Sequence, residues 1–142
     1  MSQQFESEVK QIPYSQQRVF DKLSDFTMLR QYEDRLSEIP ADTVKVEDLH
    51  FDTDSVTCRV SPVGNLDLRI VEREEPKCIK YEAATSPIPL TMWVQLLPTG
   101  DESCKFKLTL RTELNFLLKG MLQKPLKEWV EKLADALAAI PY

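Results

Sequence analysis

Residues 115–139 read NFLLKGMLQKPLKEWVEKLADALAA, and this stretch decides the fold of the chain. Its apolar residues recur in steps of three or four, at Leu118, Leu122, Leu126, Trp129, Leu133, Leu137 and, just beyond it, Ile140. Its charged residues fill the opposite side, at Lys124, Lys127, Glu128, Glu131, Lys132 and Asp135. This spacing predicts an amphipathic helix of about 25 residues, on the order of 37 Å long. Such a helix needs a large apolar partner surface.

Gly120 and Pro125 leave the course of this helix open. Proline lacks a backbone N–H and clashes with the preceding turn, so the helix either kinks here or begins near Lys124, after a separate turn over 115–123. The part before the break is a candidate flap over a cavity mouth. A simple bend that follows the curvature of a sheet explains the same residues.

The middle of the chain supplies the partner surface, because apolar and polar residues alternate along it. A first strand is predicted over 5–12, then a helix capped by Ser15 and a second short helix from Thr27 to Leu36. Six further strands are predicted at 44–50, 55–60, 66–71, 78–83, 91–97 and 104–111, with breaks at 39–40, 61–65 and 86–89. Strands with one polar and one apolar face are typical of an antiparallel sheet that is covered on one side.

The order of these elements predicts an α+β fold in a single domain, 1–142. We expect a curved antiparallel sheet of about six to seven strands, two short helices after the first strand, and a long C-terminal helix packed across the sheet. A long helix laid across a curved sheet often leaves a space that suits a small apolar molecule.

The chain resembles the START-like (SRPBCC) superfamily over nearly its whole length. The opening residues Phe5-Glu6-Ser7 and the segment VFDKLSD at 19–25 are similar to the first strand and first helix of that superfamily, and KPLKEWVEKLADAL at 124–137 is similar to the closing helix of small bacterial members. The resemblance implies a helix-grip fold with a deep cavity under the long helix, and a likeness to the polyketide cyclase/dehydratase-like group. It implies no catalytic residue, because the matching motifs are apolar and topological.

The composition favours a soluble globular domain without nucleic-acid partners. The chain has 142 residues, of which 42% are hydrophobic and 29% charged, and its net charge is −5. An acidic chain is a poor electrostatic match to nucleic acid, and no run of basic residues suggests an anionic membrane surface. No signal peptide and no apolar run of about 18 residues is present, so we expect a cytoplasmic protein without membrane insertion.

The residues that usually carry chemistry are few and scattered. Cys58, Cys78 and Cys104 are widely spaced, with no Cys-x-x-Cys pair, and His50 is the single histidine. A disulfide framework, a metal site and a Ser-His-Asp arrangement are therefore not predicted. The three glycines are isolated, which excludes a glycine-rich phosphate loop. We predict no catalytic residue, no metal and no cofactor.

The predicted cavity lining combines the apolar strand faces with the closing helix. The candidate ligand-binding residues are Val56, Cys58, Leu68, Ile70, Tyr81, Trp93, Gln95, Phe106, Leu108, Met121, Trp129 and Leu133. Two points stay open. Strand 91–97 is apolar on both faces, so either Trp93 and Gln95 point inward or Met92, Val94 and Leu96 do. Tyr81 either meets a ligand or packs in the core with its hydroxyl satisfied.

Three functions are compatible with this pattern. The first is a non-enzymatic carrier of an apolar or amphipathic small molecule. The second is a polyketide cyclase/dehydratase-like enzyme, which would need an inward acid or base, with Asp48, Glu72 and Tyr81 as weak candidates. The third is an interaction module with a filled core. Cavity volume and the polarity of its lining discriminate between them, and the sequence predicts no oligomeric state.

Overall fold

A computed structural model describes residues 2–37, 45–61, 64–83 and 89–142 of the chain. The elements are β1 (Ser2–Glu6), β2 (Lys10–Ile12), α1 (Gln16–Leu23), the 3₁₀ helix η1 (Phe26–Tyr32), α2 (Glu33–Ser37), β3 (Lys45–Phe51), β4 (Ser55–Ser61), β5 (Gly64–Glu74), β6 (Cys78–Ala83), β7 (Leu90–Gly100), β8 (Ser103–Glu113) and α3 (Phe116–Ala138). Some predicted features lie outside the described residues. These are the break at 39–40, residues 62–63 of the break at 61–65, residues 86–88 of the break at 86–89, and the start of the predicted strand at Val44.

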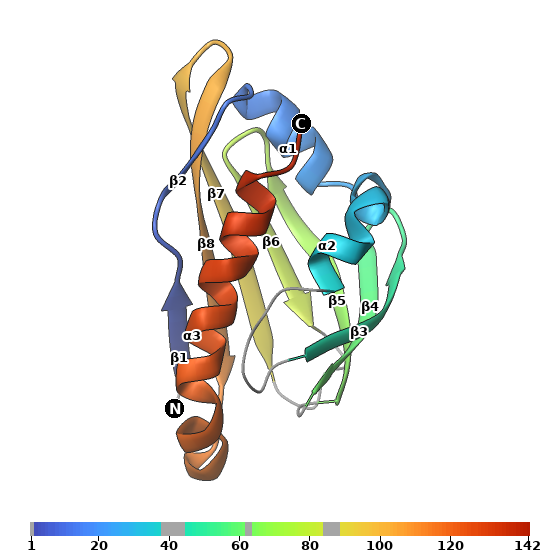
Figure 1. Cartoon of the computed structure of the whole chain (residues 1–142), viewed down its shortest axis with the longest axis vertical. Coiled ribbons are helices and arrows are strands. Elements are labelled where there is room, and N and C mark those ends of the chain that lie inside the picture. Colours follow the sequence, from blue (N-terminus) through green and yellow to red (C-terminus); the bar gives the residue numbers. More distant parts are fainter. Residues whose placement is uncertain (1, 38–44, 62–63, 84–88) are drawn as a thin grey trace.

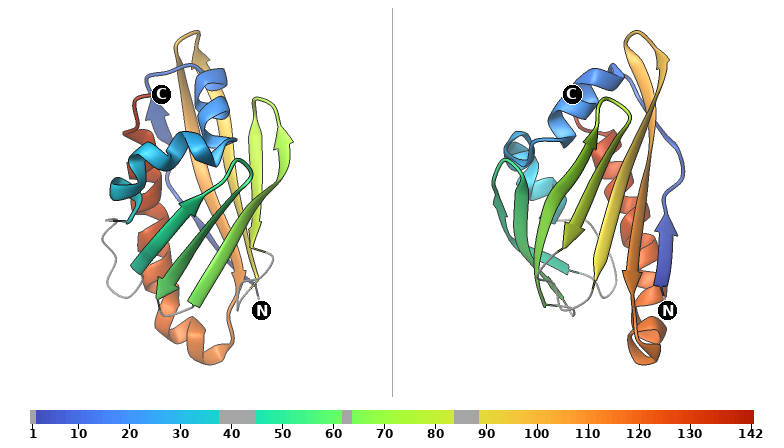
Figure 2. Two further views of the ribbon diagram at one scale, coloured as in Figure 1. Left: turned by 90° about the vertical axis from the view of Figure 1, so that its right-hand side faces the viewer. Right: turned by 180° about the vertical axis from the view of Figure 1, so that it is seen from behind.

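The strands form one antiparallel sheet in the order β1-β8-β7-β6-β5-β4-β3, and β2 also pairs with β8. The register places Tyr81, Met92 and Leu110 side by side on three neighbouring strands, and all three are buried. The sheet curves, and α3 packs across one of its faces with α1 and α2 beside it on the same face (Figures 1 and 2). The α+β helix-grip architecture predicted from the sequence is confirmed.

The predicted first strand over 5–12 is two strands. The Ser7 N–H donates to the Leu108 carbonyl at 2.9 Å, and the Ser7 hydroxyl accepts from the Leu108 N–H at 3.0 Å. A side chain thus takes the place of a backbone carbonyl in the ladder, which interrupts the strand at residues 7–9. Because of this split, the described part of the chain forms eight strands.

The helical segment after β2 agrees with the sequence prediction in its first half. Ser15 caps α1, since its hydroxyl accepts from the Arg18 N–H, and Val19, Phe20 and Leu23 are buried. The second predicted helix, from Thr27 to Leu36, is instead the 3₁₀ helix η1 followed by one turn of α2. Its start is fixed by the Asp25 carboxylate, which accepts from both the N–H and the hydroxyl of Thr27.

The closing helix α3 is one α-helix through Gly120 and Pro125, so the alternative start near Lys124 is wrong. Asn115 caps it by accepting from the Leu118 N–H at 2.9 Å. The first turns run at an angle to the rest of the helix, as the left view of Figure 2 shows, which is the bend expected around a proline. The helix continues through Pro125 because the side chains of Leu122 and Leu126, on either side of this proline, are both buried.

Two sets of polar contacts hold the C-terminal part of the chain. One joins α3 to β2 and to the residues before it, and the other joins the residues after α3 to α1. Lys10 on β2 pairs with Glu131 and with Asp135, the latter at 2.8 Å, and Glu131 also accepts from the Glu8 N–H at 2.9 Å. After the helix, the Tyr142 carbonyl accepts from the Arg18 guanidinium at 2.6 Å. Within the described ranges, every helix is too short or too polar to cross a bilayer.

Candidate functional site

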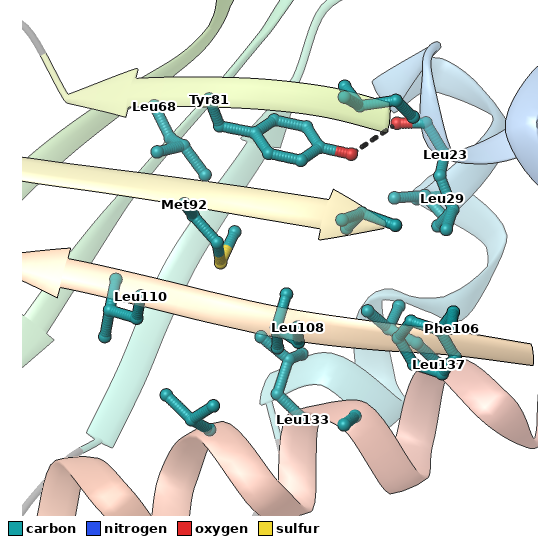
Figure 3. Packing of buried hydrophobic residues seen from close by; sticks show 14 of the residues in the cluster. Leu23, Leu29, Leu68, Tyr81, Met92, Phe106, Leu108, Leu110, Leu133 and Leu137 are labelled. Atoms are coloured by element: carbon teal, nitrogen blue, oxygen red, sulfur yellow. Dashed lines mark hydrogen bonds between the residues drawn. The ribbon is translucent and has the colours of Figure 1, made fainter. Parts of the chain in front are cut away.

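An apolar cavity of about 120 Å³ lies between the sheet, α3 and the α1–α2 segment. Its lining comes from every helical element and from strands β3 to β8. The lining residues are Leu23, Phe26, Leu29, Leu36, Val46, Leu49, Phe51, Val56, Cys58, Val60, Leu66, Leu68, Tyr81, Met92, Val94, Leu108, Trp129, Leu133 and Leu137. Figure 3 shows how Leu68, Met92 and Leu108 on the strands face toward Leu133 on α3. The polar side-chain atoms of these residues are few: the Cys58 thiol, the Tyr81 hydroxyl and the Trp129 indole N–H.

The sheet register decides which face of β7 points inward. Met92 and Val94 lie opposite Tyr81 and Ile79 on β6, and all four side chains are buried. Trp93 therefore lies on the outer face, where the Lys80 ammonium sits 6.0 Å from the centre of its ring. Gln95 is exposed on the same outer face, opposite Lys107. Of the two orientations left open by the sequence, the structure has the one with Met92, Val94 and Leu96 inward.

The structure brings most of the sequence-predicted lining residues together around the cavity. These are Val56, Cys58, Leu68, Tyr81, Leu108, Trp129 and Leu133. Ile70 and Phe106 are buried in the core next to them, outside the cavity lining. Trp93 and Gln95 lie on the outer face of the sheet. Met121 lies on the outward side of α3 and is 53% exposed, so these three residues are not placed at the cavity.

Sequence reasoning missed the lining residues contributed by the short helices and by the edge of the sheet. Leu23, Phe26 and Leu29 come from α1 and η1, and Leu49 and Phe51 come from β3. A regular alternation along β3 would place Leu49 and Phe51 on the face opposite Val46, and the register shift between Glu47 and His50 brings all three to the cavity. The tertiary placement of η1 and α2, which lie against the edge strand β3, also could not be read from the sequence.

Tyr81 is held in the cavity wall by a hydrogen bond to α1. Its hydroxyl donates to the Leu23 carbonyl, the last helical residue of α1, at 2.8 Å (Figure 3). Its ring also lies 5.5 Å from that of Phe26. Burial raises the pKa of Tyr81 far above its usual value, so the hydroxyl stays protonated. Tyr81 is thus a core residue with a satisfied hydroxyl, and its ring forms part of the cavity wall.

The remaining candidates for acid–base chemistry do not face the cavity. Asp48 lies at a register shift in β3 with φ of 55°, is exposed, and pairs with Arg59 at 3.3 Å. A second register shift between Ile70 and Glu72 leaves Glu72 exposed. Burial raises the pKa of the Cys58 thiol to about 11, so it is neutral at physiological pH and a weak nucleophile. Among the described residues, no cluster of histidine, cysteine and carboxylate side chains is arranged to hold a metal ion.

No protein-family model and no curated protein matches this sequence. Solved structures do match the fold. A START superfamily protein from Mycobacterium smegmatis superposes with a TM-score of 0.67 at 15% identity, covering 95% of this chain and 94% of that one. The ZhuI aromatase/cyclase from Streptomyces sp. R1128 gives 0.64 at 15% identity, with 97% and 92% covered. Norcoclaurine synthase from Thalictrum flavum, in complex with dopamine and hydroxybenzaldehyde, gives 0.63 at 12% identity, with 97% and 85% covered.

These likenesses extend over nearly all of the chain and over most of each matched protein, and they agree with the resemblance found in the sequence. At such low identities a structural likeness identifies the fold and leaves activity and substrate undetermined. The chain has the START-like, or SRPBCC, helix-grip fold.

Proposed function

We propose that the protein binds and shelters a compact apolar molecule in the cavity under α3, without transforming it. The observation that carries this proposal is the cavity of about 120 Å³, lined by apolar side chains from the sheet, from α3 and from the α1–α2 segment. The side chains that line such a cavity lack dispersion contacts on one side, and an apolar ligand would restore these contacts.

The cavity volume sets the size of the ligand. Pockets for drug-sized ligands measure about 300–1,000 Å³, so the described cavity is small. An apolar cavity of about 150 Å³ in another protein stays dry and binds benzene. We therefore propose a ligand with the bulk of one aromatic ring or a short aliphatic chain. A larger amphipathic molecule would require the packing around the cavity to open.

The expected affinity is modest. Burial of roughly 200 Å² of apolar ligand surface contributes about 5 kcal/mol, which corresponds to a dissociation constant on the order of 0.2 mM before other costs. Polar substituents on the ligand would weaken binding, because the Tyr81 hydroxyl already donates to Leu23 and other polar lining atoms are scarce.

The alternative of a cyclase/dehydratase-like enzyme has less support. Such an enzyme needs a proton donor or acceptor beside its substrate, and among the described lining residues only Tyr81 and Cys58 could serve, both with a raised pKa. The matched norcoclaurine synthase structure holds two single-ring molecules. The fold therefore accommodates ligands of the size proposed here. Nucleic acid is not proposed as a partner, given the net charge of −5.

Titration with toluene, followed by amide chemical shifts, tests this proposal. We expect saturable shifts at residues around the cavity in the native protein. In Val56→Phe, the phenyl ring of the new side chain enters the cavity from β4 and occupies its volume, so toluene binding is lost. The matched control is Val71→Phe on the outer side of β5, where Val71 is 49% exposed, and this variant keeps binding.

Native protein without saturable shifts, or Val56→Phe with unchanged toluene affinity, would contradict the proposal. If Val56→Phe does not fold, Leu133→Ala provides the test from the other direction. It enlarges the cavity at α3 and should admit naphthalene, at a cost of about 2–5 kcal/mol in stability. Failure of both toluene and naphthalene to bind this folded variant would also contradict the proposal.

The natural ligand can be sought by native mass spectrometry of protein purified from its own cytoplasm, the compartment that the sequence predicts. A consistent added mass, identified after extraction as a small apolar compound, supports the carrier function. Recovery of a compound larger than a single aromatic ring would show that the cavity expands on binding.

A further inference from the structure

The N-terminal end of α3 carries apolar side chains that the fold leaves uncovered. Phe116 is 94% exposed, Leu117 73% and Met121 53%. In all views of Figures 1 and 2 this end of the helix projects beyond the ends of the strands. These three residues form what we call the helix tip. Exposed apolar side chains that gather in one patch mark interaction sites, unlike apolar residues scattered singly over a surface.

The helix tip is not needed to hold α3 on the sheet. The inward side of the same turns is formed by Leu118 and Leu122, of which Leu122 is fully buried. Gly120 lies on the outward side between Phe116 and Lys124, and an added Cβ there would meet no atom within 4 Å. The outward side is therefore open to a partner and free of packing constraints.

Positive charge surrounds the helix tip in an otherwise acidic protein. Residues 116–127 contain Lys119, Lys124 and Lys127 and no acidic residue, whereas the whole chain has a net charge of −5. None of these three lysines forms an ion pair with a residue in the described part of the chain. This charge is complementary to an anionic surface.

The acidic groups that share a hollow with these lysines are already paired. The shallow hollow lined by Lys124 and Lys127 also contains the carboxylates of Glu6, Glu128, Glu131 and Asp135. Glu6 pairs with Lys107 at 3.2 Å, Glu128 pairs with Lys132 at 2.9 Å, and Glu131 and Asp135 both pair with Lys10. The charges of Lys124 and Lys127 are thus left available to a partner.

Two of the three lysines lie beyond the apolar groups along the helix axis, whereas Lys119 lies between Phe116 and Met121. At about 1.5 Å per residue, Met121 lies about 7.5 Å along the axis from Phe116, and Lys124 and Lys127 lie about 12 and 16 Å from it. Apolar faces of peripheral helices enter about 5–10 Å into the boundary between headgroups and acyl chains. When the helix tip occupies that boundary, the two lysines lie at the level of the lipid phosphates.

We propose that the helix tip docks the protein on anionic lipid membranes, with Phe116, Leu117 and Met121 in the headgroup–acyl boundary and Lys124 and Lys127 on the phosphates. A second copy of the chain is a poorer occupant. Stable dimers bury about 800 Å² per partner over 20–30 residues, and a projecting tip of three side chains offers much less. The proposal revises the expectation from the sequence, where charge was judged over the whole chain. It concerns peripheral docking at the surface of the bilayer.

Co-sedimentation with lipid vesicles tests this docking. Native protein should bind vesicles of mixed phosphatidylcholine and phosphatidylglycerol, bind phosphatidylcholine vesicles weakly, and be released as salt is added. The double variant Phe116→Ser/Leu117→Ser should lower the partition coefficient about tenfold or more. Lys124→Gln/Lys127→Gln should lower it about fivefold for each charge removed. All of these side chains are exposed, so the variants should keep the native circular dichroism spectrum.

Val71→Ser, which removes an apolar side chain that is 49% exposed on β5, is the matched control and should bind vesicles as the native protein does. Native protein that stays in the supernatant with anionic vesicles would overturn the proposal. An equal loss in Val71→Ser would also overturn it. So would a concentration-dependent dimer in sedimentation velocity that Phe116→Ser/Leu117→Ser abolishes while no vesicle binding is seen.

Discussion

Tyr81 joins the end of α1 to the wall of the cavity. Its hydroxyl donates to the Leu23 carbonyl, which lies at the C-terminal end of α1, where helix carbonyls lack partners within the helix. The side chain is 3% exposed, so water cannot replace the bond if the hydroxyl is removed. The Tyr81 ring also lies 5.5 Å from the Phe26 ring, so this residue contacts both α1 and η1.

Tyr81→Phe should therefore lower the free energy of unfolding by about 1–2 kcal/mol, because it leaves a buried carbonyl without its donor. Urea unfolding measures the change. Tyr14→Phe is the control, since the Tyr14 hydroxyl donates no hydrogen bond to a described residue, and it should change the unfolding free energy by less than about 0.5 kcal/mol. Equal stability of the two variants would show that the Tyr81 hydroxyl contributes nothing.

The attachment of α3 to β2 rests on Lys10 and its two carboxylate partners. The Lys10 side chain is 16% exposed, and its hydrogen bonds to Asp135 and Glu131 raise the pKa of Lys10 to about 12. The hydrogen bond from Lys10, followed by that from the Glu8 N–H, holds the pKa of Glu131 below its usual value. Glu131 thus links the helix both to a side chain and to the backbone of the first strands.

Glu131→Ala should cost about 1–2 kcal/mol in the free energy of unfolding, because it removes an acceptor from both Lys10 and Glu8. Glu128→Ala removes a carboxylate from the same helix that pairs only with Lys132 four residues later, and should cost less than about 0.5 kcal/mol. Chemical denaturation of the two variants side by side measures the difference. A cost for Glu128→Ala as large as that for Glu131→Ala would contradict this account of the attachment.

Pro125 gives α3 its bend and removes one hydrogen bond from its first half. Pro125→Ala restores a backbone N–H that can donate to the Met121 carbonyl. We expect slower amide hydrogen exchange in the turns before residue 125 and a gain of about 1–2 kcal/mol in the free energy of unfolding, since part of the gain is offset by a more flexible unfolded chain. Lower stability of the variant would mean that the bend itself is required for the packing of Leu122 and Leu126.

The whole molecule should be most stable between about pH 5 and pH 9. The pKa values of Cys58 and Lys10 are raised in the folded protein, to about 11 from 9.0 and to about 12 from 10.5. Their contribution to stability is complete below the unfolded values and is lost as the pH rises through the folded ones. Burial raises the pKa of Tyr81 and Tyr142 in the same direction. The pKa of Glu131 is lowered in the folded protein. Its contribution to stability is therefore complete above the unfolded value of about 4.5 and is lost as the pH falls below that value.

Cys58→Ala isolates one part of this profile. The variant should lose stability less steeply than the native protein between about pH 9 and pH 11, by a total on the order of 2 kcal/mol over that range. Urea unfolding at several pH values measures both slopes. Identical slopes would show that the Cys58 thiol ionises in the folded protein as readily as in the unfolded chain.

The sequence by itself determined the elements and their inner faces wherever a single period is present. Leu122, Leu126 and Leu133 recur at helical spacing, and Val56, Cys58 and Leu68 alternate along their strands, so their burial follows from local geometry. The same residues, apart from Leu122 and Leu126, form much of the cavity lining. The α+β order of the elements followed from these periods and from the turn residues between them.

Only the tertiary structure decided the features that depend on neighbours. Strand 91–97 has two apolar faces, and pairing of Met92 with Tyr81 selected the inner one. Register shifts turned Asp48 and Glu72 outward, where a regular alternation would have placed them inward. The volume of the cavity and the uncovered helix tip likewise arise from how far α3 extends over a curved sheet. A period in the sequence specifies which side of an element is apolar, whereas the space between two elements depends on side chains that meet from distant parts of the chain.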